Sequence, residues 1–278
     1  MPSTLPFAPP GFFSDLQRAS ELAVGAGVGI GAARRWHPGL PLPCHGEIFA
    51  SSCEGTGAAL ALALLGNGLG DGPGTGAQVE GRPISGQISG QEGTLLWVQD
   101  REAQRRTGRP YRPGLPPAFR RRIVHVAAKT AQDALFAMEE GVKCRELAGV
   151  IGEIAGNPKA FDFTASRRLT LAAERHGVPL LVVRVDAARD LSSARMRWEA
   201  RQVPSARPRW NAAAPGAPAW RAELFRARAY APGEWILRDD GTCPTIGLAA
   251  ERVESGAAPA PDHGDLVRAA GDRPLAAC

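Results

Sequence analysis

The sequence predicts an α/β fold in which helices flank a mostly parallel β-sheet. Segments 94–98 and 180–185 are short, nearly continuous apolar runs, as the buried strands of parallel sheets are. Helical segments with apolar stripes alternate with such strands, which is typical of a sheet covered on both faces. After about residue 186 the predicted strands follow one another without helices, and this indicates an antiparallel extension of the same sheet.

The individual elements follow from local signals. The predicted strands are 46–50, 94–98, 123–127, 147–154, 180–185, 196–203, 222–228 and 234–237. A compact apolar helix is predicted over 58–65. Thr130 opens a second helix, with Asp133 three residues later as a capping box. Asp162 is the predicted N-cap of a third helix that reaches His176, and Gly177 ends it.

Composition divides the chain into three parts. Residues 1–38 are rich in proline and glycine and are predicted to be flexible, with one short helix. Residues 39–243 form the α/β domain. Within it, segment 66–93 holds ten glycines and is predicted to be a flexible surface loop, because ordering so many glycines costs much backbone entropy. Residues 244–278 lack apolar periodicity, which predicts a disordered tail.

Charge and cysteine content limit the classes of protein. The formal net charge is +5, and only three of the 33 basic residues are lysines. This arginine excess permits a nucleic-acid or acidic partner without requiring one. The five cysteines form no C-x-x-C pair, which favours reduced thiols in a cytoplasmic protein without a zinc site. The longest dense apolar run is far too short to span a membrane.

The turn after the first predicted strand has the outline of a phosphate loop without its chemistry. A working loop needs G-x-x-x-x-G-K-[ST], in which the lysine meets the phosphates and the hydroxyl holds Mg²⁺. When the chain is aligned with that pattern, Ala50 and Gly55 stand at the two glycine positions. Thr56 then replaces the lysine, and Gly57 replaces the residue with the hydroxyl. The sequence therefore predicts a degenerate phosphate loop that holds no nucleotide, metal or other cofactor, and no catalytic residues.

Glu153 lies where a metal-holding acid would stand, near the end of the strand 147–154. A carboxylate at a strand end is more often solvated or caps a loop. The strand 94–98 is followed by Gln99 and Arg101 where a water-activating acid is expected. The acids required for hydrolysis are thus incomplete, and the chain is predicted to be a pseudo-ATPase.

Arginines are the candidate binding residues. Between residues 195 and 228 there are eight arginines and two acids, interleaved with three tryptophans. Basic groups beside stacking rings are what a site for single-stranded nucleic acid uses, but a solvated sheet edge or a protein interface has the same composition. Both interpretations are open. The candidate contacts to DNA or to a partner protein are Arg167, Arg168, Arg195, Arg197, Trp198 and Arg201.

Several short segments between residues 39 and 238 occur in the same order as similar segments of one protein family. They are 39–41, 46–49, 95–98, 162–169, 171–174, 177–179, 193–198 and 203–205. The most specific are Thr-Ala-Ser-Arg-Arg-Leu at 164–169 and Ala-Arg-Met-Arg-Trp at 194–198. In this order they resemble the ImuA proteins, which are bacterial relatives of RecA and of the SulA-type division inhibitors. The resemblance implies a RecA-like fold.

The resemblance also implies a role in SOS-induced mutagenic translesion DNA synthesis. An ImuA-like protein is expected to be an accessory protein. Its expected partners are an ImuB-like, inactive Y-family polymerase homologue and an error-prone polymerase α subunit, with RecA and single-stranded DNA as further candidates. Two alternatives stay open at this point: a DNA-dependent RecA-type ATPase and a SulA-like cell-division inhibitor.

Overall fold

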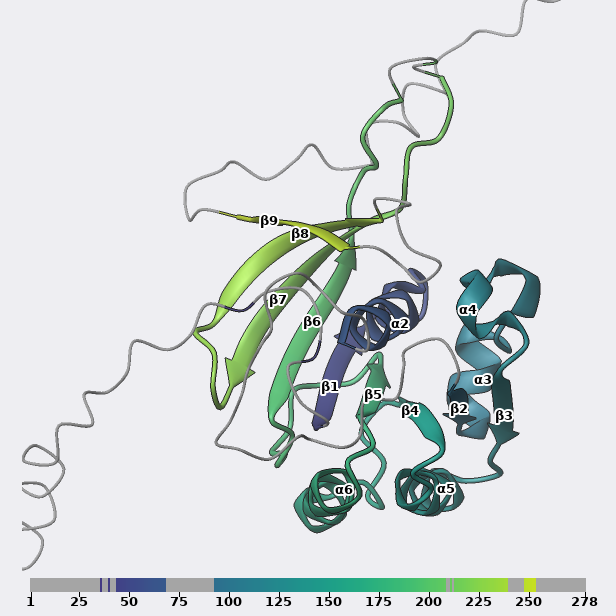
Figure 1. Ribbon diagram of the computed structural model, residues 1–278. Helices are drawn as coiled ribbons and strands as arrows, with labels where there is room; N and C mark the ends of the chain where they lie inside the picture. Colours follow the sequence, from purple (N-terminus) through teal and green to yellow (C-terminus); the bar gives the residue numbers. More distant parts are fainter. Residues whose placement is uncertain are drawn as a thin grey trace, which may run out of the picture.

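The computed structural model of the chain describes residues 36, 40, 44–68, 93–208, 211, 213–239 and 248–253. In these residues the strands form one sheet in the order β3-β2-β4-β5-β1-β6-β7-β8-β9 (Figure 1). The strands are β1 (His45–Ala50), β2 (Thr94–Gln99), β3 (Ile123–Ala127), β4 (Leu147–Ala155), β5 (Leu180–Val185), β6 (Met196–Gln202), β7 (Ala219–Ala227), β8 (Gly233–Asp239) and β9 (Leu248–Arg252). The helices are α2 (Thr56–Gly68), α3 (Arg101–Thr107), the 3-10 turn η1 (Arg112–Gly114), α4 (Pro117–Arg120), α5 (Ala131–Lys143) and α6 (Phe163–His176).

The sheet has the predicted parallel and antiparallel parts. From β3 to β6 every neighbouring pair of strands is parallel, and β1 lies between β5 and β6. From β6 to β9 every pair is antiparallel. The sequence therefore predicted the α/β class, the mostly parallel sheet and its antiparallel extension correctly.

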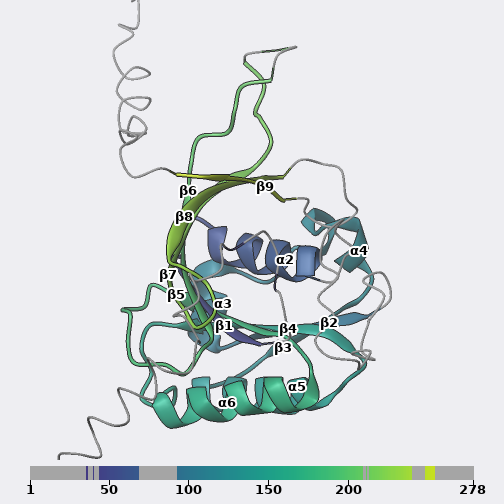
Figure 2. The same ribbon diagram turned by 60° about the vertical axis from the view of Figure 1, so that its left-hand side comes forward.

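Helices cover the two faces of the sheet unequally. Figure 2 shows α2 on one face and α5 with α6 on the other. The strands β6, β7 and β8 curve around α2, so their inward side chains join its apolar core (Figure 1). A second core lies between α5, α6 and the strands β2, β4 and β5. No helix within the described ranges is long and apolar enough to cross a lipid bilayer.

The helix ends follow the predicted capping chemistry. Thr130 Oγ1 accepts a hydrogen bond from the backbone N–H of Asp133 at 3.1 Å and donates one to the Asp133 carboxylate at 2.8 Å. Asp162 accepts a hydrogen bond from the N–H of Ala165 at 2.8 Å. Gly177 ends α6 with a φ of 72°, which glycine adopts without steric strain. These residues fix α5 and α6 against the sheet.

Two parts of the fold differ from the expectation. Segment 100–117 is basic and interrupted by prolines, a pattern typical of an irregular connection, yet α3 forms there, with the Asp100 carboxylate accepting a hydrogen bond from Ala103 N at 2.6 Å. The predicted disordered tail was wrong for β9, which pairs with β8 beyond residue 244. An Ala-rich segment becomes a strand here because the edge of β8 offers backbone partners.

The other predicted boundaries are only partly covered by the described residues. The described part of 1–38 is Trp36, which is buried against Trp198 and Trp235 with ring centroids 4.7 and 4.9 Å away. That residue belongs to the core and not to a flexible segment. The first residues of the predicted glycine-rich loop continue α2 as far as Gly68. The rest of that loop up to residue 92 and the segment 254–278 lie outside the described residues.

Candidate functional site

A pocket of about 730 Å³ lies at the carboxyl edge of the parallel strands. Parallel α/β sheets bind ligands at this edge, where the strand order reverses. Ala50, Gly55, Gly57 and Glu153 all line the pocket, so the structure brings the predicted loop residues and the strand-end acid together. Its other walls come from α2, the α3–α4 connection and β7.

The β1–α2 turn has the backbone outline of a loop that leads a strand into a helix. Ala50 ends β1, Gly55 has a φ of 62°, and Thr56 is the first residue of α2. A Cβ on Gly57 would lie 2.6 Å from Val183 Cγ1 and 2.8 Å from Ala50 Cβ. Glycine is therefore required at 57 for packing between the turn and β5, whatever the turn binds.

Polar groups of the turn find their partners inside the protein. The buried Thr56 hydroxyl donates a hydrogen bond to the carbonyl of Ala200 in β6 at 3.2 Å. The Glu54 carboxylate accepts from the N–H of Gln202 at 2.8 Å. No residue from 50 to 57 carries a positive charge. The turn thus presents a carboxylate and an occupied hydroxyl where a phosphate loop presents a cation and a free hydroxyl.

The backbone N–H of Ser52 in the same turn already donates a hydrogen bond to a carboxylate of the protein itself. Asp186 Oδ1 accepts a hydrogen bond from the Ser52 N–H at 2.9 Å, and Arg106 pairs with Oδ2 at 2.9 Å. These contacts hold the pKa of Asp186 below its ordinary value. Among the described non-glycine residues Asp186 alone has a positive φ, of 50°. The sequence pattern gave no indication of this anchor, because residue 186 only marks the end of β5.

Glu153 is buried at the floor of the pocket and fully engaged. Its carboxylate accepts hydrogen bonds from Trp97 Nε1 at 2.7 Å, Thr107 Oγ1 at 2.8 Å and Gln99 Nε2 at 3.1 Å. Burial raises the pKa of Glu153, although these three donors act in the opposite direction. Gln99 extends the chain of hydrogen bonds to His125 Nε2 at 2.8 Å. The contacts show Glu153 tying β2, α3 and β4 together.

The predicted arginine and tryptophan contacts do not form one surface. Trp198 is fully buried and packs on Trp36, so it cannot stack on a base, and its assignment as a contact is wrong. Arg197 is 4 % exposed and lies in the interior. Arg197 lies on the same face as Arg195 and Arg201, as strand alternation requires. The three side chains differ in burial, because Arg197 is buried, Arg195 is half-buried and Arg201 is exposed.

Three arginines of that set, Arg168, Arg195 and Arg201, are each paired with a glutamate. Arg168 on α6 pairs with Glu139 of α5. Arg195 pairs with Glu174 of α6, which raises the pKa of the arginine. Arg201 pairs with Glu199 on its own strand. Arg167 is exposed on α6. Part of the arginine excess between residues 195 and 228 is therefore neutralised or buried, because Arg195 and Arg201 pair with glutamates and Arg197 lies in the interior.

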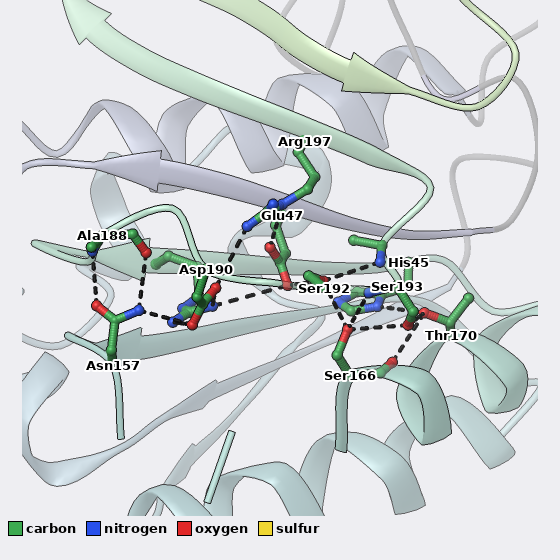
Figure 3. Close-up of polar contacts among 12 residues, drawn as sticks. His45, Glu47, Asn157, Ser166, Thr170, Ala188, Asp190, Ser192, Ser193 and Arg197 are labelled. Carbon is green, nitrogen blue, oxygen red and sulfur yellow. Dashed lines mark hydrogen bonds and ion pairs between the residues drawn. The ribbon is translucent and has the colours of Figure 1, made fainter. Parts of the chain in front are cut away.

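Sequence analysis missed a buried network of ionic side chains below β1, β5 and β6 (Figure 3). Glu47 accepts hydrogen bonds from Arg197 Nε at 2.9 Å and Ser192 Oγ at 2.5 Å. Arg184 binds the Asp190 carboxylate with two nitrogens at 3.0 and 3.1 Å. Asn157 Nδ2 donates to the same carboxylate at 2.8 Å. The available signal was a charge inside each of two otherwise apolar strands, Glu47 and Arg184.

His45 joins that network from the start of β1. Its Nδ1 lies 2.9 Å from Thr170 Oγ1, and the Thr170 hydroxyl lies 2.7 Å from Ser193 Oγ (Figure 3). Complete burial lowers the pKa of His45 from 6.5 to about 4, and the nearby Arg184 and Arg197 act in the same direction. The imidazole is therefore neutral at pH 7, and the network positions β1 against α6 and β6.

Comparison with known proteins gives one match by name. No protein-family model matches the chain. Over 170 residues it is 30 % identical to "Protein ImuA" from two strains of Caulobacter vibrioides. The aligned region covers 56 % of this chain and 64 % of each relative, so the chain spans less than two thirds of the relatives it matches. This similarity confirms the resemblance to ImuA proteins that the short sequence segments between residues 39 and 238 indicate.

Proposed function

We propose that the chain is a non-hydrolysing accessory protein of damage-induced mutagenesis. The observation that carries this proposal is the 30 % identity to ImuA, together with the segments that resemble ImuA proteins. In this role the chain serves translesion synthesis under the SOS response and acts by binding other proteins. Its proposed partners are an ImuB-like polymerase homologue and an error-prone polymerase α subunit, with RecA as a further candidate.

The β1–α2 turn supports the non-hydrolysing part of the proposal. Phosphoryl transfer is catalysed almost wholly by positioning and by neutralising charge on the phosphates. Here the Thr56 hydroxyl is bonded to Ala200 and the Ser52 amide to Asp186. A triphosphate would have to displace these contacts and would then meet Glu54 without a compensating cation. We therefore propose that the α/β architecture serves as a scaffold for partners.

Gene disruption tests the cellular role. A strain without the gene is expected to grow normally undamaged but to show a lower ultraviolet-induced mutation frequency, restored by the wild-type gene on a plasmid. An unchanged induced mutation frequency would overturn the proposal. Filamentation on overexpression, combined with normal mutagenesis, would instead indicate a SulA-like division inhibitor.

Affinity capture tests the proposed mode of action. The tagged full-length chain, purified from ultraviolet-treated cells, is expected to retain the ImuB-like polymerase homologue identified by mass spectrometry. An Arg167→Glu/Arg168→Glu variant reverses two exposed charges on α6, and an Arg221→Glu/Arg238→Glu variant, outside the candidate contacts, serves as a matched control on the antiparallel extension. Failure of the wild-type chain to retain any polymerase component would contradict the adaptor role.

A further inference from the structure

The strongest concentration of positive charge lies between β2 and β3. Residues 101–122, here called the basic platform, contain eight arginines and one acid, Glu102. They form α3, η1 and α4 at the side of the sheet away from the antiparallel extension (Figure 1). Prolines interrupt this segment, so its sequence alone indicates an irregular connection with exposed arginines.

Most of this charge has no acidic partner in the described part of the chain. Arg105 and Arg106 pair with Glu102, and Arg106 also reaches Asp186. Arg112 and Arg120 donate to backbone carbonyls, which fixes the side chains but leaves their charge uncompensated. The remaining arginines of the basic platform, which have no ion pair among the described residues, are Arg101, Arg109, Arg121 and Arg122. In the antiparallel extension, by contrast, Arg201, Arg221 and Arg238 each pair with a glutamate.

An aromatic ring and a hollow accompany these charges. Tyr111 is 73 % exposed, although tyrosine normally buries most of its ring. Tyr111, Arg109 and Arg120 all line the pocket of about 730 Å³ at the carboxyl edge. Trp97 and Trp220 contribute aromatic walls to the same pocket. Arg109 and Arg120 thus lie beside a partly aromatic hollow, whose lining also includes Glu54, Glu153 and Asp239.

The positive charge of this segment affects the pKa of a neighbouring histidine, His125. The pKa of His125 on β3 is lowered, first by burial and then by the charges of Arg109 and Arg112. Both arginines therefore lie near His125, and they precede and follow Tyr111 in sequence. Groups arranged in this way can hold consecutive phosphates on either side of a base.

We infer that the basic platform binds single-stranded DNA, with phosphates at Arg109 and Arg112 and a base stacked on Tyr111. Arginine has the planar donor geometry that fits phosphate, and a tyrosine face accepts any base. Duplex DNA fits less well, because α3 has seven residues and α4 four, too short for a recognition helix in a groove. The inference goes beyond the proposed adaptor role, since it requires no partner protein.

Fluorescence anisotropy with a labelled oligothymidylate and the purified full-length chain tests this site. Arg109→Gln/Arg112→Gln is expected to weaken binding and to make the slope of log K against log salt shallower by about 1.4, for two phosphate contacts on a single strand. Tyr111→Ala is expected to weaken binding about tenfold, whereas Tyr111→Phe keeps the stacking face and the affinity. Arg221→Gln/Arg238→Gln removes two glutamate-paired arginines of the antiparallel extension that are not among the candidate contacts, and it is expected to bind as the wild type does.

The outcomes decide the inference without reference to mutagenesis in cells. Thermal melting first confirms that each variant is folded, and the Tyr111→Phe variant gives the stacking test a form that preserves packing. Wild-type affinity in Arg109→Gln/Arg112→Gln, or an equal loss in the control pair, would overturn the site. No effect of Tyr111→Ala, combined with equal displacement of the probe by polyglutamate, would show that the platform takes an acidic protein and would also overturn it.

Discussion

Arg197 lies directly opposite Glu47 in the register of β6 and β1, and its Nε donates a hydrogen bond to Glu47 Oε2 at 2.9 Å. Both side chains are buried. The guanidinium also lies 5.0 Å from the centroid of the Phe49 ring. The pair joins the central strand β1 to β6, the strand at which the antiparallel extension begins, so it stabilises that junction.

Replacing Arg197 is expected to affect stability more than binding. Arg197→Gln removes the nearer of the two arginines that pair with the buried Glu47, and breaking a buried ion pair typically costs about 3–5 kcal/mol in free energy of unfolding. Arg201→Gln removes an exposed pair and is expected to cost about 0–1 kcal/mol. Urea unfolding of both variants measures the difference. Equal midpoints for the two variants would contradict the structural role of Arg197.

Trp198 provides a second test of burial against binding. Trp198→Ala removes a ring that packs on Trp36 and Trp235, and such truncations in a core cost about 3–5 kcal/mol. The exposed Tyr111→Ala is expected to change stability by less than about 0.5 kcal/mol. Thermal melting monitored by circular dichroism compares the two. A stable Trp198→Ala protein would mean that the ring does not hold the core together.

The wild-type chain is expected not to hydrolyse ATP, with or without single-stranded DNA. Installing the missing groups as Thr56→Lys/Gly57→Thr is expected to destabilise the protein, because a Cβ at 57 would lie 2.6 Å from Val183 Cγ1. Overpacking of this kind costs about 1–3 kcal/mol. Phosphate release and melting temperature are measured together. Turnover by the wild type that scales with protein concentration would refute the expectation and favour the ATPase alternative.

Acid pH is expected to destabilise the protein through His45. Its pKa is about 4 when folded and near 6.5 otherwise, so the unfolded chain binds more protons between these values. The free energy of unfolding therefore falls as pH decreases through that window, by about 3 kcal/mol from this residue. Stability above pH 6.5 is unaffected by this residue's titration.

A His45→Gln variant isolates that contribution. Glu153, whose pKa is raised by burial, acts in the opposite sense because the folded state keeps its proton to higher pH. The measured quantity is therefore the difference in unfolding free energy between wild type and variant, followed by urea titration from about pH 7 to pH 4. An identical pH dependence for both proteins would show that His45 is not neutral in the fold.

Much of the parallel core could be predicted because its signals are local. Apolar runs define the strands, and residues such as Thr130 and Asp162 cap the helices as expected. Short α3 was missed because seven residues rich in arginine carry little apolar periodicity. The strand β9 was missed because an Ala-rich segment has no strand pattern of its own, and pairing with β8 creates one.

The site was predictable only where position along the chain determines position in space. Carboxyl ends of parallel strands meet at one edge, and Ala50 and Glu153, which the sequence places at the ends of two such strands, line one pocket. The partners of the arginines were not predictable. Arg195 and Arg197 meet Glu174 and Glu47, which are remote in sequence, and composition alone cannot reveal such neutralisation.

The central position of β1 has a consequence for synthesis on the ribosome. His45 pairs with Leu180 in β5, and Glu47 pairs with Arg197 in β6, so both edges of β1 find their partners only in the second half of the chain. A nascent chain that emerges from its N-terminus must therefore hold β1 and α2 unpaired until β5 and β6 have been translated. During that interval an open strand edge and an apolar helix are exposed to aggregation, and they are natural substrates for chaperones.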